Sequence, residues 1–87
     1  MKKAIILTVG GVDLSFEPTE LEYNEYMNEL AQGEVNGSAH NFLVNSVTEE
    51  SKADLRAITD DNPGAALQIC GHVLKQYTPK LEIKVKK

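Results

Sequence analysis

The feature that most constrains the fold is a glycine pair, Gly10-Gly11, within the apolar stretch 4–17. The runs on either side are short and rich in β-forming residues, and glycine adopts the positive φ angles that a two-residue hairpin turn requires. The pair therefore predicts an antiparallel hairpin with strands at about 3–9 and 12–17. When the residues flanking the turn pair with each other, one face carries six apolar side chains: Ile5, Leu7, Val9, Val12, Leu14 and Phe16.

The segment after the hairpin has the apolar periodicity of α-helices. Thr19 and Glu22 have the spacing of a capping box, in which each side chain satisfies a backbone amide at a helix start. Gly33 is expected to end this first helix. Three polar residues precede the later helices as expected caps, the last with Pro63 at the first helical position: Ser38, Thr48 and Asn62. The helices are expected at about 20–32, 39–47, 49–59 and 63–77.

The segment 80–86 alternates apolar and polar side chains, with Leu81, Ile83 and Val85 on one face, which is the pattern of a β-strand. We expect it to lie beside the first strand and parallel to it, since an antiparallel arrangement would bring lysines from both chain ends together. The expected fold class is α+β in a single domain, 1–87. The N-terminal hairpin and the C-terminal strand form a three-stranded sheet, covered on one face by three to four helices.

The charge of the chain is unevenly distributed. It has 9 Lys and Arg residues against 13 Asp and Glu residues, a net charge of −4. Between Asp13 and Asp61 there are twelve acidic residues and only two basic ones, Lys52 and Arg56. A protein that grips phosphate backbones needs a basic surface, so we do not expect nucleic acid as a partner.

Localisation is read from what the sequence lacks. No apolar run approaches the ~20 residues that span a bilayer, and the N-terminus does not have the pattern of a signal peptide. The single cysteine cannot form an internal disulfide. These observations predict a cytoplasmic protein with no membrane partner.

Cys70 and His72 lie two residues apart and are the first candidates for chemistry. Cys70 falls on the apolar stripe of the last helix, where a thiol behaves as a small hydrophobic group and its pKa is raised. The two side chains point about 200° apart around a helix. Zinc would need two further ligands, and His40 is the only other histidine. We therefore interpret Cys70 as a packing residue.

The other polar clusters also lack the spacing of a site. His40 with Asn41 would serve a cysteine nucleophile only beside an activated thiol, which Cys70 does not resemble. The adjacent pair Glu49-Glu50 would point in two directions at a helix N-terminus, where acidic residues are common. Asp60-Asp61-Asn62 lacks the spaced oxygen ligands of a calcium loop. We expect no catalytic residue, no metal and no cofactor.

Four segments, in this order and spacing, resemble the small tail assembly chaperones of tailed bacteriophages: YNEYMNEL (23–30), AHNFLVNSV (39–47), PGAALQICGHVL (63–74) and LEIKVKK (81–87). The resemblance implies a non-enzymatic protein that binds the long, largely helical tape-measure protein and keeps it soluble while the tail tube polymerises around it. It also implies recruitment of tail-tube subunits and departure before the virion is finished. The protein would then act in the cytoplasm of the bacterial host and be absent from the mature virion.

The resemblance supplies no residue pattern for partner binding, so the site is a hypothesis from residue type. Aromatic side chains are good contact anchors, and we expect contributions from Tyr23, Tyr26, Asn41 and Phe42. An exposed strand edge would allow homo-oligomers. Two alternatives stay open: an acidic phage-encoded inhibitor that mimics nucleic acid and binds a host protein, and a small enzyme using Cys70 or His72.

Overall fold

The predicted hairpin is confirmed in the computed structural model, which describes residues 4–78 and 81–86. Strand β1 (Ile5–Val9) and strand β2 (Val12–Phe16) pair antiparallel in the predicted register. Gly10 and Gly11 have φ angles of 56° and 83°. Both angles lie in the left-handed region, which explains why glycine occupies both turn positions.

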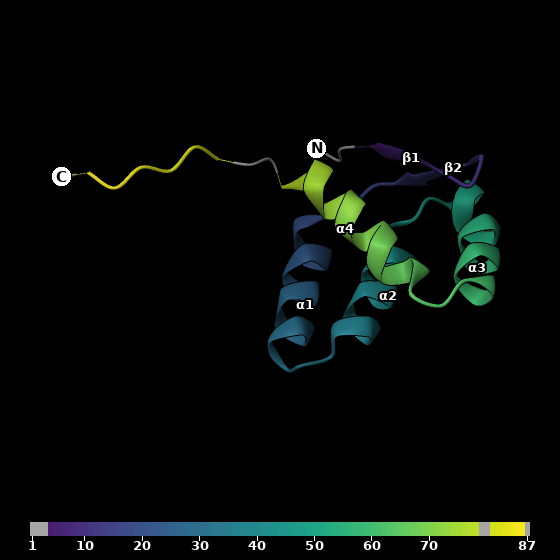
Figure 1. The fold of residues 1–87 in the computed structure, drawn as a ribbon, viewed down its shortest axis with the longest axis horizontal. Helices are drawn as coiled ribbons and strands as arrows, with labels where there is room; N and C mark the ends of the chain where they lie inside the picture. Colours follow the sequence, from purple (N-terminus) through teal and green to yellow (C-terminus); the bar gives the residue numbers. More distant parts are fainter. Residues whose placement is uncertain (1–3, 79–80, 87) are drawn as a thin grey trace.

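The helices all lie on one side of the hairpin (Figure 1). Helices α1 and α2 form an adjacent pair, and α4 packs against both α2 and β1. Helix α3 lies near the turn end of the hairpin and contacts β2 and α4. The elements are α1 (Glu20–Ala31), α2 (Val35–Ser46), the short 3-10 helix η1 (Glu49–Ser51), α3 (Lys52–Asp61) and α4 (Ala65–Tyr77).

The core lies between the hairpin and the helices, and every regular element except η1 contributes an apolar side chain to it. Leu14 and Phe16 of β2 have no exposed surface, and Phe42 of α2 is 2% exposed. The buried apolar cluster comprises Ile5, Leu14, Phe16, Tyr26, Ala39, Phe42, Leu43, Val47, Leu55, Ile69, Cys70 and Val73.

The prediction of a third strand is wrong. Within residues 4–78 and 81–86 the sheet has two strands, β1 and β2, and residues 81–86 have no regular secondary structure. This segment runs away from the helices (Figure 1), and Leu81, Ile83 and Val85 are 73%, 83% and 85% exposed. An alternating pattern specifies which side chains a strand would bury, but it does not specify where the hydrogen-bonding partner lies. The fold is α+β with a two-stranded sheet.

The far edge of β2 is covered by the segment that leaves α2. The amide of Glu17 donates to the carbonyl of Ser46 at 2.7 Å, and the amide of Thr48 donates to the carbonyl of Ser15 at 2.9 Å. The amide of Ser15 donates to the Ser51 hydroxyl at 2.9 Å. Among the residues that the structure describes, no strand pairs with the other side of β1, which is the open edge of the sheet.

The start and the end of α1 are confirmed. The amide of Glu22 donates to the Thr19 hydroxyl at 3.2 Å, and the amide of Thr19 donates to the Glu22 carboxylate at 2.9 Å. Gly33 follows the helix with φ 88°. The amide of Glu34 donates to the carbonyl of Glu29 at 3.2 Å, which completes a Schellman motif.

The starts of α2 and α4 differ from the expected positions. Helix α2 begins at Val35, ahead of residue 39, because the tight Schellman turn lets the chain re-enter a helix at once; Ser38 lies inside it and donates to the carbonyl of Val35 at 2.9 Å. Helix α4 begins at Ala65, after Pro63, since the Asn62 amide group donates to the carbonyl of Ile58 at the end of α3. Thr48 precedes η1 without a side-chain cap.

We expect Thr19→Ala to lower the free energy of unfolding by about 1 kcal/mol, since the capping box loses its hydroxyl acceptor. For a domain of this size the loss lowers Tm by ~4–8 °C. The measurement is thermal unfolding followed by circular dichroism. Thr19→Ser keeps the acceptor and should melt near the wild type. Equal Tm values for the alanine and serine variants would contradict a stabilising box.

Candidate functional site

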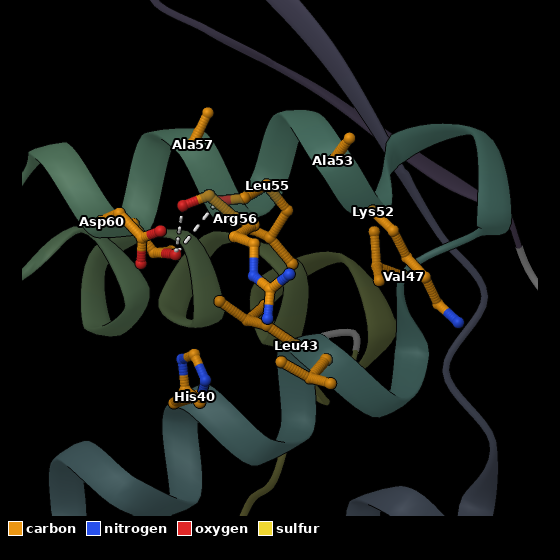
Figure 2. A pocket seen from close by; sticks show the side chains of 11 residues that line it. His40, Leu43, Val47, Lys52, Ala53, Leu55, Arg56, Ala57 and Asp60 are labelled. Carbon is orange, nitrogen blue, oxygen red and sulfur yellow. Dashed lines mark hydrogen bonds between the residues drawn. The ribbon is translucent and has the colours of Figure 1, made fainter.

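A groove of about 900 Å³ separates α2 from α3 (Figure 2). On each helix the main lining positions are three, four and seven residues apart, so they share one helical face. The α2 wall consists of His40, Leu43 and Val44, together with Val47 directly after the helix, and the α3 wall of Lys52, Ala53, Leu55, Arg56, Ala57, Thr59 and Asp60.

The inner part of the groove is apolar and continuous with the core. Leu43, Val47 and Leu55 are 1%, 8% and 4% exposed, so they form a fixed floor. Val44 stands higher on the α2 wall and is 45% exposed. Val44, above an apolar floor, is accessible for contact with an apolar surface of a partner.

The rim of the groove is polar and includes both basic residues of the acidic region 13–61. The Lys52 ammonium pairs with the Glu49 carboxylate at 2.9 Å. Arg56 makes no ion pair within residues 4–78 and 81–86, and its side chain reaches from α3 toward α2 (Figure 2). His40 and Asp60 lie toward one end of the groove, on opposite walls (Figure 2). The groove thus combines an apolar floor with an unpaired cation.

The groove contains no nucleophile beside a base. In the described part of the chain no three His, Cys, Asp or Glu side chains are grouped so that they could hold a metal ion. The same residues form no helix with the length and hydropathy needed to cross a bilayer.

Cys70 is a packing residue, as predicted. Its side chain is 1% exposed in the core, and burial raises the pKa of the thiol to about 11, while a hydrogen bond with Tyr26 acts in the opposite direction. The thiol is therefore protonated at neutral pH and is a poor nucleophile. His72 is exposed, away from the buried face of α4 that holds Cys70.

The four residues predicted to bind a partner differ in accessibility. Tyr26 and Phe42 are 7% and 2% exposed, with ring centroids 5.5 Å apart in the core. Tyr23 is half-buried against Tyr77, at 5.7 Å between ring centroids. Asn41 is exposed and donates to the Glu29 carboxylate at 3.0 Å. Partner binding by this set stays a prediction, in which Asn41 and the free part of Tyr23 are the accessible groups.

Sequence reasoning missed the groove between α2 and α3. On the helix expected at 39–47, Ala39, Phe42, Leu43 and Val47 share one apolar face, and Val44 lies just outside it. An apolar residue just outside a helical stripe is a weak signal of a second contact surface, because isolated exposed apolar residues are common. The separation of α2 and α3 depends on tertiary structure and leaves no mark in the sequence.

The raised pKa of Cys70 predicts how stability depends on pH. In the unfolded chain the thiol ionises near pH 9.0, and in the folded protein near pH 11. Between these values unfolding releases a proton, so rising pH favours the unfolded state. The contribution of the buried thiol to the free energy of unfolding is therefore fully present below pH 9, and it is lost between pH 9 and 11.

The control is Cys70→Ala, which has no thiol but the same other titrating residue types. The free energy of unfolding of each protein is measured with urea at pH 8, 9, 10 and 11. The difference in this free energy between wild type and variant should be constant up to pH 9. Above pH 9 the wild type should lose stability relative to the variant, because only the wild type has a thiol that ionises on unfolding. A difference that stays constant to pH 11 would contradict a thiol held protonated by burial.

Comparison with known proteins agrees with this architecture. The structure is similar to that of an uncharacterised protein, rbstp2171, from Bacillus stearothermophilus, with a TM-score of 0.77 and 14% identity over 99% of this chain and 90% of that one. At this identity the likeness concerns the fold alone. No curated protein matches the sequence. A family model described as phage tail assembly chaperone matches residues 5–87, nearly the whole chain, and the chain therefore belongs to the phage tail assembly chaperone family.

Proposed function

We propose that this chaperone binds the tape-measure protein of its phage and that the groove between α2 and α3 holds an apolar helical stripe of that partner. Family membership supports a role in tail assembly. The observation that supports binding of a helical stripe is the open groove, with its buried floor and the half-exposed Val44 on its wall.

The shape of the groove suits a helix. A long amphipathic helix exposes an apolar stripe that aggregates unless it is covered, and an apolar groove between two helices is a recurring way to cover it. The floor residues Leu43 and Leu55 come from the two opposite walls. Because both are already packed in the core, the groove is preformed, and binding loses little conformational entropy in the chaperone.

The charges around the groove indicate which charged side chains a partner would carry. Arg56 makes no ion pair within residues 4–78 and 81–86, and it belongs to a sequence region, 13–61, in which acidic residues outnumber basic ones by twelve to two. An acidic side chain beside the partner's apolar stripe would pair with Arg56, while basic segments elsewhere in the partner would face the acidic surface. Such complementarity adds specificity and association rate more than affinity.

Tail-tube subunits are the second partner in this proposal. Tyr23 and Asn41 lie outside the groove lining and are available to them. Protein binding is the whole activity proposed. It takes place in the cytoplasm of the bacterial host, and the chaperone leaves before the virion is complete.

The test is co-expression with the tape-measure protein of the same phage, followed by a solubility assay and affinity pull-down. We expect the wild-type chaperone to keep the tape-measure protein soluble and to co-purify with it. Val44→Gln places a polar side chain on the groove wall and should weaken binding about tenfold, a loss of about 1.4 kcal/mol.

The matched control is Val35→Gln. Val35 lies on the same helix with nearly the same exposure, 46% against 45%, but outside the groove. It should bind like the wild type. Equal binding by both variants, with a loss in Asn41→Ala, would move the tape-measure site to the edge of α1 and α2. An insoluble tape-measure protein that never co-purifies would reject the proposed function.

A further inference from the structure

The segment 81–86, here called the arm, has the sequence of a buried strand but no surface to pack against. Leu81, Ile83 and Val85 alternate with polar residues and are 73%, 83% and 85% exposed. The arm runs away from the helices and lies along the longest extent of the chain, which is 51 Å against 27 Å and 22 Å for the other two. Six extended residues span about 20 Å, enough to reach well beyond the domain's own surface.

The same chain has an open strand edge of matching length and polarity. β2 is covered on its far edge by the segment after α2, whereas β1 has a neighbour on one side alone within the described sheet. On the inner face of β1, Ile5 is buried while Leu7 and Val9 are half-buried. A strand added at this edge would cover the exposed parts of Leu7 and Val9.

A parallel register matches the two strands position by position. With Leu81 beside Ile5, Ile83 lies beside Leu7 and Val85 beside Val9, all on the inner face. A hollow of about 460 Å³ bordered by Val9, Ile58 and Ile69 lies where Val85 would arrive.

Charge also favours this register. It places Lys84 beside Thr8 on the outer face, where the Thr8 hydroxyl donates to the exposed Asp13 carboxylate at 2.7 Å. The reverse direction would place Glu82 there instead, next to the like charge of Asp13.

We propose that the arm of one copy adds as a parallel third strand to the β1 edge of a second copy. The arm leads away from its own hairpin, so an edge in another molecule is the surface of the right length, polarity and charge for it. Each copy has both an arm and an edge, so exchange satisfies both, either in a closed pair or in a ring. The inference concerns this chain alone and does not depend on the tape-measure protein.

The test uses the full chain at concentrations from about 10 to about 500 μM, a range that covers typical strand-exchange affinities. Light scattering gives the mass, and hydrogen exchange reports the backbone amides of β1 and the arm. The wild type should reach at least twice its chain mass of 9.6 kDa, with slower exchange in both segments as concentration rises.

The disrupting variant carries Leu81→Asn, Ile83→Asn and Val85→Asn. Because these side chains are largely exposed, the domain should stay folded while the mass falls to that of one chain. The matched control, Glu82→Gln with Lys86→Gln, changes the opposite face and should assemble like the wild type. The proposal would be overturned by a single-chain mass at every concentration or by an assembly that persists in the asparagine variant. Slow hydrogen exchange of the arm amides in a protein with the mass of one chain would also overturn it.

Discussion

The structure depends on the way β2 is enclosed. Leu14 and Phe16 fill the core on its inner face, β1 pairs with one edge, and the residues after α2 pair with the other. The bridge between Phe16 and Val47 fixes where α2 stops, since Val47 must be extended to pair with the strand. The chain then restarts as η1 and α3 beside the hairpin, while α2 remains against α1 and α4. The groove between α2 and α3 is a consequence of this pairing.

Those parts of the fold that are determined locally were predicted from the sequence. The glycine turn, the hairpin register and the Thr19–Glu22 capping box each depend on residues within a few positions of one another. The third strand was predicted wrongly because an alternating pattern indicates which side chains share a face of a strand, but not which strand it pairs with. The early start of α2 was missed because Ser38 was read as a cap, whereas the Schellman turn at Gly33 lets the helix begin at Val35. The groove was missed because it depends on how α2 and α3 are placed relative to each other, which no local sequence pattern specifies.

Charge and apolar surface have separate places on this protein. The acidic side chains of residues 13–61 lie outside the core, and the two basic residues of that region, Lys52 and Arg56, both border the groove. A uniformly acidic surface would keep a small protein soluble and would repel any acidic partner. A local cation beside an apolar floor removes that repulsion at one position. In the proposed function, the groove is the place in the acidic region where an apolar helix with acidic flanks would be repelled least.

The groove and the β1 edge have no residue in common, so occupation of one leaves the other free. The groove is lined by residues from 40 to 60, and the hollow beside β1 by residues of the hairpin turn, the end of α3 and the start of α4. Copies joined through their arms would therefore present several grooves at fixed separations. A partner with repeated apolar stripes binds such an assembly more tightly than it binds single copies, because each further contact forms at a high effective concentration. Weak individual grooves are then sufficient for a long helical partner, and they also permit release one contact at a time.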